Sequence, residues 1–463
     1  MNLTALTRRG ALLLSLAALA GCALKAPRVA DGAPQRPPIV FVHGNGDTAA
    51  LWLTTIWRFE SNGWPKDRLH AVDMPYPLAR DADDKPQPGR TSTEEARAFL
   101  AAEVDAVLQR TGAKQVVLIG NSRGGLVMRN YIASGGAAKV SHAILGGTPN
   151  HGVWASPTFR PTNEFNGAGP FLTRLNNQGS PGIEVTPGPK WMTIRSDAND
   201  KFAQPDGVWI GAKGTPTNVT AAGPELRGAE NVVIPGIDHR ETSYGPLAFA
   251  AMWRFLTGSE PASPRAQPEA RVVLDGKVNG LGLDNKPGTG DFANNLPLAG
   301  ATVEGYATDA ATGARLGPAL HRKSVGADGR WGPLVTTSKT ALEFVVSAEG
   351  FATTHVYRSP FVRSSDIVHL RAERIATADR DAPAVVTLTR PRGYFGIPRD
   401  EIELDGKSPP AGIPSGVAGV SVAKARLVEA AERAVAGSFN GERIVGRSWP
   451  TAGNHVVLLE LHE

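Results

Sequence analysis

One pentapeptide constrains the fold of this chain more than any other part of it. GNSRG, at residues 120–124, lies between an apolar β-type run, Gln115–Ile119, and a helical run, Leu126–Ile132. The two glycines permit a tight turn that holds Ser122 in a strained conformation with its hydroxyl exposed. The helix N-terminus beneath this serine favours developing negative charge. A glycine-rich turn with an ordinary serine has the same pattern, so the interpretation depends on the rest of the chain.

Three further segments place polar residues after strand-type runs, in a fixed order along the chain. Pro38–Val42 leads into HGNG at residues 43–46. Trp191–Ser196 is followed by three aspartates, and the run that begins at Asn231 leads through a turn to His239. A serine, a carboxylate and a histidine in this order can form a relay in which the histidine moves the serine proton. The position of the histidine, after the serine and the aspartates, therefore strengthens the interpretation of the pentapeptide.

Together these segments resemble the bacterial and archaeal lipase family of α/β-hydrolases. The resemblance extends over residues 37–258 and includes HGNG, GNSRG, TPNHG at residues 148–152 and NVVIPGIDH at residues 231–239. In this family a G-x-S-x-G between a strand and a helix is the nucleophile elbow. The usual elbow is GHSMG or GHSQG, whereas here Asn121 replaces the histidine and Arg123 replaces a small or apolar residue. We therefore expect an intact nucleophile with a cationic side chain near the mouth of the site.

The resemblance implies a catalytic triad of Ser122, Asp200 and His239. The order Ser, Asp, His is that of α/β-hydrolases and of neither common protease arrangement. Asp197 and Asp206 compete with Asp200 for the position of the acid. Asp200 is favoured because its surroundings, NDKFAQP, resemble the acid loop of small bacterial lipases.

The resemblance also implies an oxyanion hole. An HG pair after the first strand of such a sheet typically places a backbone N–H at the oxyanion position. The expected donors are the backbone N–H groups of Asn45 and Arg123. His43 is expected to be structural.

The N-terminal residues predict export. Thr7–Gly10 contains two arginines and precedes an apolar run, Ala11–Ala20, that is too short to span a bilayer and is typical of a signal peptide over residues 1–21. Leu19–Cys22 resembles a bacterial lipoprotein cleavage box, and the paired arginines resemble a twin-arginine signal. Cys22 is the only cysteine, which favours lipidation there and a lipoprotein of the outer membrane or cell surface. A plain secretory peptide, with Cys22 lost or unmodified, is the alternative.

The 463 residues suggest about three domains at roughly 150 residues each. After a proline-containing tether (residues 22–37), helical and strand patterns alternate over residues 38–258, which predicts a mostly parallel sheet covered by helices. His151–Lys190, rich in Pro, Gly and Asn, occupies the position where such hydrolases insert a lid; a static covering loop fits equally well. Residues 259–269, with three prolines and two serines, predict a linker.

Beyond the linker the pattern is almost entirely β. Residues 270–375 resemble a transthyretin-like or carboxypeptidase-regulatory-like β-sandwich, and a second β-rich segment, residues 376–463, is expected to pack with it. The order of hydrolase and β-rich region resembles archaeal lipases with a C-terminal lipid-binding β domain. The role of this region stays open between stabilising the hydrolase and binding lipid or polymer. The expected strands are Val272–Val278, Ala301–Thr308, Leu342–Ala348, His355–Tyr357, Val385–Thr389 and His455–Leu461.

The sequence thus predicts a secreted serine hydrolase of carboxylic esters, a lipase or esterase that acts on lipid or other acyl esters. No cofactor is expected, and no metal-ligand spacing is recognisable. The net charge of +5 is mild, and no basic run with interleaved aromatic residues indicates nucleic acid. Two alternatives remain: a polyester depolymerase with the same triad, and a surface-binding lipoprotein whose hydrolase domain is vestigial.

Overall fold

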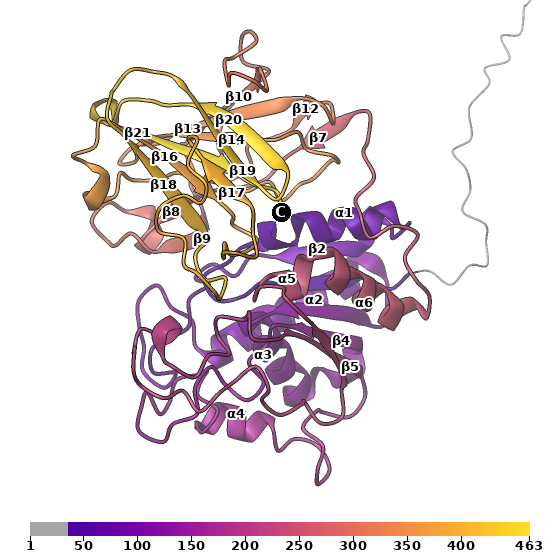
Figure 1. The fold of residues 1–463 in the computed structure, drawn as a ribbon. Coiled ribbons are helices and arrows are strands. Elements are labelled where there is room, and N and C mark those ends of the chain that lie inside the picture. Colours follow the sequence, from indigo (N-terminus) through magenta and orange to yellow (C-terminus); the bar gives the residue numbers. More distant parts are fainter. Residues whose placement is uncertain (1–35) are drawn as a thin grey trace, which may run out of the picture. The chain divides into compact units, whose positions relative to one another are not determined.

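A six-stranded parallel sheet organises residues 37–258 of the computed structural model, which describes residues 36–463 (Figure 1). The predicted signal peptide, Cys22 and most of the tether lie outside the described residues. Each strand pairs in parallel with its neighbours. The order across the sheet is β2 (Leu69–Val72), β1 (Ile39–Val42), β3 (Val116–Asn121), β4 (Val140–Gly146), β5 (Lys190–Ser196) and β6 (Glu230–Ile234).

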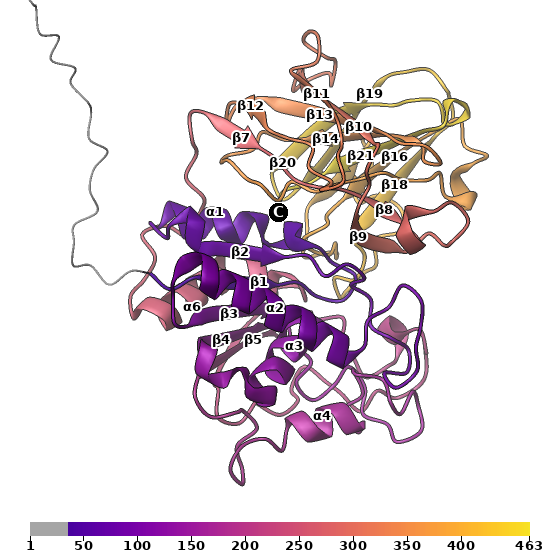
Figure 2. The same ribbon diagram turned by 180° about the vertical axis from the view of Figure 1, so that it is seen from behind.

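Helices cover both faces of this sheet (Figure 2). On one face, α1 (Leu53–Ser61) and α6 (Pro246–Thr257) bury their apolar residues against the strands. On the other face lie α2 (Thr93–Thr111) and α3 (Arg123–Tyr131). Two short helices, α4 (Pro170–Leu175) and α5 (Glu241–Tyr244), complete this half. Alternation along each strand explains the two cores, because neighbouring side chains point to opposite faces.

Local sequence signals set the ends of α2. The hydroxyl of Ser92 accepts a hydrogen bond from the N–H of Glu95, and the Glu95 carboxylate accepts one from the N–H of Ser92. This capping box satisfies two N–H groups that have no partner within the helix. At the other end Gly112 adopts a left-handed conformation with φ +66°. Both signals lie within a few residues of the helix end that they set.

The C-terminal β region, residues 270–463, is built from several sheets. The largest has seven strands in the order β11-β10-β13-β14-β21-β16-β18. Its strands are β10 (Thr302–Thr308), β11 (His321–Ser324), β13 (Ala341–Ser347), β14 (Thr353–Arg358), β16 (Ala384–Thr389), β18 (Val422–Leu427) and β21 (His455–Glu460). The last strand, β21, lies between β14 and β16 and runs parallel to both. One sheet therefore combines strands from residues 270–375 and 376–463.

Smaller sheets flank this one. They are β7–β12, β15–β8–β9 and β17–β19–β20. The predicted strand Val272–Val278 is wrong as a single element, because its two ends belong to different sheets. A Cβ on Gly276 would lie 2.0 Å from the carbonyl oxygen of Val368, so another segment packs tightly against the chain between the two strands. The remaining bounds are β7 (Val272–Leu274), β8 (Val278–Leu281), β9 (Ala293–Pro297), β12 (Leu334–Thr336), β15 (Leu370–Arg371), β17 (Ile402–Leu404), β19 (Ala434–Phe439) and β20 (Glu442–Arg447).

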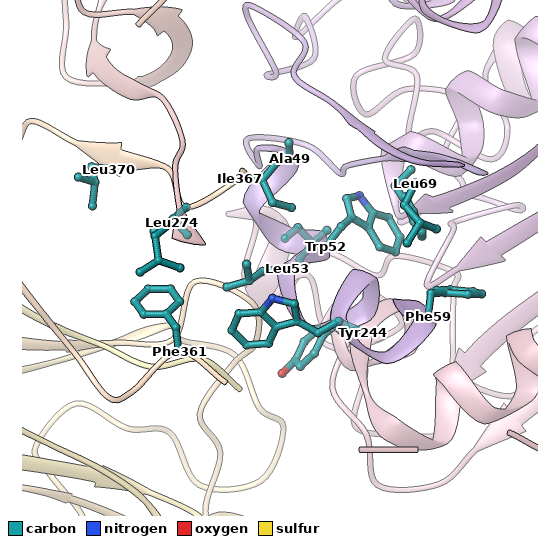
Figure 3. Packing of buried hydrophobic residues seen from close by; sticks show 14 of the residues in the cluster. Ala49, Trp52, Leu53, Phe59, Leu69, Tyr244, Leu274, Phe361, Ile367 and Leu370 are labelled. Carbon is teal, nitrogen blue, oxygen red and sulfur yellow. The ribbon is translucent and has the colours of Figure 1, made fainter. Parts of the chain in front are cut away.

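The predicted order of architectures, a helix-covered parallel sheet followed by a β-rich region, is confirmed. A single apolar cluster joins the two (Figure 3). Trp57 of α1 donates its ring N–H to the carbonyl of Ser364 and packs edge-on against Phe361, with the ring centroids 6.2 Å apart. Fully burying such a side chain contributes about 1.5–3 kcal/mol. Helix α1 is therefore buried between the sheet and the β region.

Candidate active site

The turn after β3 holds Ser122 in a conformation that few residues adopt. Its φ is +52° and its ψ is −119°. The Ser122 N–H donates to the carbonyl of Gly146, and its carbonyl accepts from the N–H of Gly125. The neighbouring backbone leaves no room for side chains, since a Cβ on Gly124 would lie 2.2 Å from the carbonyl oxygen of Val42. Both the strain and the glycine are those the pentapeptide predicts.

Asp200 and His239 meet across two loops at the carboxyl ends of β5 and β6. The His239 Nδ1 lies 2.9 Å from the Asp200 Oδ2. The other carboxylate oxygen of Asp200 accepts the N–H of Phe202, whose ring packs edge-on against the imidazole. A carboxylate beside Nδ1 places the imidazole proton there and leaves Nε2 as the acceptor. Among the residues that the structure describes, Nε2 has no hydrogen-bond partner.

The two competing aspartates have local partners instead. Asp197 accepts hydrogen bonds from the N–H groups of Asn199 and Gly236. Asp206 accepts one from the N–H of Val208. Asp206 stabilises its own turn, and Asp197 joins its turn to the one that follows β6. Of the three predicted candidates, Asp200 is the one that the structure brings to His239.

The loop after β1 brings Asn45 to the same cavity as Ser122 and His239. The Asn45 side chain accepts the N–H of Ala79 at 2.7 Å, which holds this loop against its neighbour. His43 is buried and accepts the N–H of Met74 at Nε2, while Nδ1 lies 2.9 Å from the Gly44 carbonyl. Burial lowers the pKa of His43 despite that backbone bond. These contacts match a structural role.

The prediction that Arg123 places a cationic side chain near the mouth of the site is wrong. Arg123 is buried, with 1% of its side chain exposed, and it forms a two-point ion pair with Glu164, from Nε to Oε1 at 2.7 Å and from Nη2 to Oε2 at 2.9 Å. Its remaining N–H groups donate to the carbonyls of Pro77 and Thr91. Burial raises the pKa of Glu164, and Arg123 opposes that shift. The guanidinium therefore points away from the cavity and ties the helix α3 to the loop that carries Glu164.

Asn121, which stands where the family commonly has histidine, also points inward. Its side-chain N–H₂ donates to the hydroxyl of Ser243 at 2.7 Å. The residue is completely buried. It links the strand before the turn to α5, the helix that follows His239. Asn121 thus connects the two elements that carry the serine and the histidine.

A cavity of about 250 Å³ opens over these residues. Its walls come from the loops after β1 and β2, the turn at Ser122, the covering stretch 151–190, the loop after β5 that carries Asp200, the loop after β6 that carries His239, and the β region. The contribution of the β region is Tyr394, which the sequence reasoning missed. The residues that line the cavity include Asn45, Asp81, Arg90, Ser122, Trp154, Arg160, Phe165, Phe202, Trp209, His239, Arg240 and Tyr394.

Cations surround Tyr394 on the wall of this cavity. The Lys201 Nζ lies 3.7 Å from the centre of its ring, and the Arg240 guanidinium carbon lies 4.8 Å away. Burial, together with the charge of Arg240, lowers the pKa of Lys201 to about 8. Arg240 is paired with Asp47. The wall is therefore a charged, aromatic surface assembled from both halves of the chain.

A parallel sheet of this topology, with a strained serine between β3 and α3, defines the class of the protein as an α/β-hydrolase. Residues 36–167 match the family model described as lipase (class 2). Residues 270–375 match the model described as lipase C-terminal domain. The chain thus carries a class 2 lipase domain and a lipase C-terminal domain, and it is a carboxylic-ester hydrolase of the lipase and esterase kind, as the sequence predicts.

Solved structures with a similar fold include several bacterial and archaeal enzymes. The mature Bacillus licheniformis lipase BlEst2 is 22% identical, covering 49% of this chain and 94% of its own, with a TM-score of 0.34. A Paleococcus ferrophilus monoacylglycerol lipase is 14% identical, covering 49% and 96%, with a TM-score of 0.32. The Legionella pneumophila phospholipase PlaB is 13% identical, covering 73% and 96%, with a TM-score of 0.33. Each likeness is distant.

Within residues 36–463, no helix combines the length and the apolar character that crossing a bilayer requires. In the same range no group of three or more His, Cys, Asp or Glu side chains is arranged to hold a metal ion.

Proposed function

We propose that the protein hydrolyses carboxylic esters with Ser122 as nucleophile, His239 as general base and Asp200 as the residue that orients His239. The observation that carries this proposal is the hydrogen bond between Asp200 and His239 beside a cavity that Ser122 also lines. The unpartnered Nε2 of His239 supports it further. In enzymes of this kind the contact between serine and histidine is often long until substrate binds.

The reaction follows from these positions. The Ser122 Oγ attacks the ester carbonyl carbon while the His239 Nε2 takes its proton. The backbone N–H groups of Asn45 and Arg123 receive the negative charge that develops on the carbonyl oxygen. His239 returns the proton to the departing alcohol, which leaves an acyl group on Ser122. Water, deprotonated by His239, then releases the carboxylic acid and restores the serine.

The cavity favours a small acyl group. Its volume of about 250 Å³ lies below the roughly 300–1,000 Å³ that is common for ligand sites. Arginine and aspartate side chains share its walls with the aromatic rings. We therefore propose short-chain esters as better substrates than long-chain triglycerides or a polyester, which would need the covering stretch to open.

Paired substitutions test the triad. Ser122→Ala is expected to lower the turnover of a soluble p-nitrophenyl ester by several orders of magnitude while the far-ultraviolet circular dichroism stays unchanged, because triad residues act as a unit. Asp200→Asn is expected to lose far more activity than Asp197→Asn, its matched control on the same loop. A Ser122→Ala protein that keeps a tenth of the wild-type turnover, or an Asp197→Asn protein that loses more than Asp200→Asn, contradicts the assignment.

We also propose that the protein is exported and anchored by lipidation of Cys22, with the membrane as its partner. The support is the LAGC sequence at residues 19–22 and the absence of any other cysteine. Two or more acyl chains on one residue would give stable anchoring where a single chain does not. Intact-mass analysis of the protein from the membrane fraction tests this.

A further inference from the structure

One segment of the β region reaches both loops of the proposed triad. Residues 390–419, which connect β16 to β18, are called here the tail clamp. They lie beyond residues 270–375, the part of the β region that matches the lipase C-terminal domain. Four residues that flank the triad members, at positions 199, 201, 238 and 241, each contact the tail clamp.

The tail clamp contacts the loop that carries His239 (here the histidine loop) through a buried ion pair. The Arg390 Nη1 donates to the Asp238 Oδ2 at 2.5 Å, and its Nη2 donates to the Glu241 Oε1 at 2.6 Å. Asp238 directly precedes His239 and has no exposed surface. Its Oδ2 also accepts the N–H of Tyr394, at 2.8 Å. With the bond from Arg399 to the Glu241 Oε2, four hydrogen bonds from the tail clamp end on the carboxylates of Asp238 and Glu241, which lie on either side of His239.

The same carboxylate of Asp238 holds the histidine loop from within. Its Oδ1 accepts the N–H groups of Arg240 and Glu241, at 2.8 and 2.9 Å. Burial by itself would raise the pKa of Asp238, but Arg390, Arg399 and the surrounding N–H groups hold it below the usual value. The ionised Asp238 side chain therefore links Arg390 to the backbone N–H groups of Arg240 and Glu241.

The tail clamp contacts the loop that carries Asp200 (here the acid loop) through other groups. The N–H of Ala418 donates to the Asn199 Oδ1 at 3.0 Å, and the Lys201 Nζ donates to the carbonyl of Gly419 at 2.9 Å. Asn199 and Lys201 stand on either side of Asp200. Gly419 packs so closely on the Trp209 ring that a Cβ there would lie 1.8 Å from it. The loop that carries Asp200 is thus in direct contact with the tail clamp.

We propose that two residues of the tail clamp belong to the catalytic site: Arg390 as a positioning residue for His239, and Tyr394 as a wall of the substrate cavity. This rests on the proposed triad. The hydrogen bond between Asp200 and His239 joins two separate loops, and the tail clamp contacts both of them. A misplacement of a reacting group by 1 Å can reduce the rate by roughly 100-fold. The β region then contributes to catalysis through the geometry of the triad, in addition to any contact with lipid.

Substitutions at two buried arginines distinguish a role in positioning His239 from a general effect on stability. Arg390→Met removes the ion pair with Asp238, whereas Arg392→Met is the matched control. Arg392 is equally buried but donates to the carbonyls of Leu461, His462 and Ala50. We expect both substitutions to lower the Tm. Only Arg390→Met should reduce kcat on a soluble p-nitrophenyl ester by about tenfold or more, with KM changed much less.

A spectroscopic readout keeps this test independent of the proposed triad. The Nδ1 proton of His239, held by Asp200, should give a low-field resonance in the one-dimensional proton spectrum. We expect Arg390→Met to shift or broaden it and Arg392→Met to leave it in place. If Ser122→Ala keeps its activity, the proposed function fails, while this resonance still reports whether Arg390 positions His239. An unchanged resonance together with equal losses of kcat in both variants would overturn the proposal.

If Arg390→Met does not fold, substitutions at two more exposed arginines test the same positioning role. Arg399 donates to the Glu241 Oε2 at 2.8 Å and to the Gly236 carbonyl, and its side chain is 20% exposed. Arg426 of β18 pairs with Asp379 and Asp381, which both belong to the β region. Arg399→Gln is expected to lower kcat and to shift the resonance, and Arg426→Gln is expected to do neither. The opposite order, or no difference between the two, would contradict a positioning role.

Discussion

The buried ion pair between Arg123 and Glu164 predicts a measurable loss of stability when one of its charges is removed. Both side chains are at most 2% exposed, and they share two hydrogen bonds. Glu164→Gln removes the negative charge and leaves the guanidinium of Arg123 buried with two carbonyl partners. Breaking such a pair costs about 3–5 kcal/mol, and the remaining carbonyls favour the lower end of that range.

The expected change in melting temperature follows from the size of the unit. Residues 37–463 form one compact body. At roughly 2.1 cal/mol/K per residue its unfolding entropy is about 0.9 kcal/mol/K, so a loss of about 3 kcal/mol lowers the Tm by about 3 °C. Differential scanning calorimetry measures this shift directly.

The double variant Arg123→Met/Glu164→Met distinguishes a charge effect from a packing effect. Because it leaves no buried charge, it should recover at least half of the loss, although the carbonyls of Pro77 and Thr91 lose their donor. It also keeps the backbone N–H of residue 123, so its esterase activity should stay within about tenfold of wild type, whereas loss of an oxyanion donor costs about 100- to 1,000-fold. A double variant that is destabilised as much as Glu164→Gln, or more, would refute this charge effect.

Two further predictions concern acid stability and the membrane. Asp73 lies between His369 and Lys277 of the β region; burial opposes the shift, but these two side chains hold the pKa of Asp73 far below its usual range. A depressed pKa gives stability that is complete above the unfolded value near 3.9 and is lost as the pH falls below it. The difference in unfolding free energy between wild type and Asp73→Asn, about 3 kcal/mol at pH 5, should therefore shrink in urea titrations below about pH 4; a constant difference would contradict this. Cys22→Ser should move the protein from the membrane fraction to the soluble fraction, whereas an unmodified, soluble wild-type protein would reject the anchor.

Much of the candidate site could be predicted because its signals are local. The turn at Ser122 needs a strand, two glycines and a helix within a few residues, and all of them are visible in the sequence. The choice of Asp200 over its neighbours also came from the residues beside it. In the structure Asp200 is the one of the three that contacts His239. The ends of α2 are likewise set by local residues, the capping box and Gly112.

The direction of the Arg123 side chain could not be predicted in this way. Next to a catalytic serine, a cation is expected to face the substrate. Its partner, Glu164, is 41 residues away in a stretch without periodic pattern. The pairing depends on how the covering loop folds over α3, and the sequence contains no local record of that contact.

By itself, the sequence determined the order of the architectures, the family resemblance and the residues proposed for the triad, since each depends on neighbours a few positions apart. The tertiary structure decided that Val272–Val278 is two strands, that β21 lies between β14 and β16, and that Tyr394 and Arg390 reach the candidate site. These outcomes depend on contacts between segments about 70 or more residues apart in the chain, such as Arg390 with Asp238, 152 residues away. Long-range pairing is set by the packing of the whole chain, because no property of either segment alone specifies its partner.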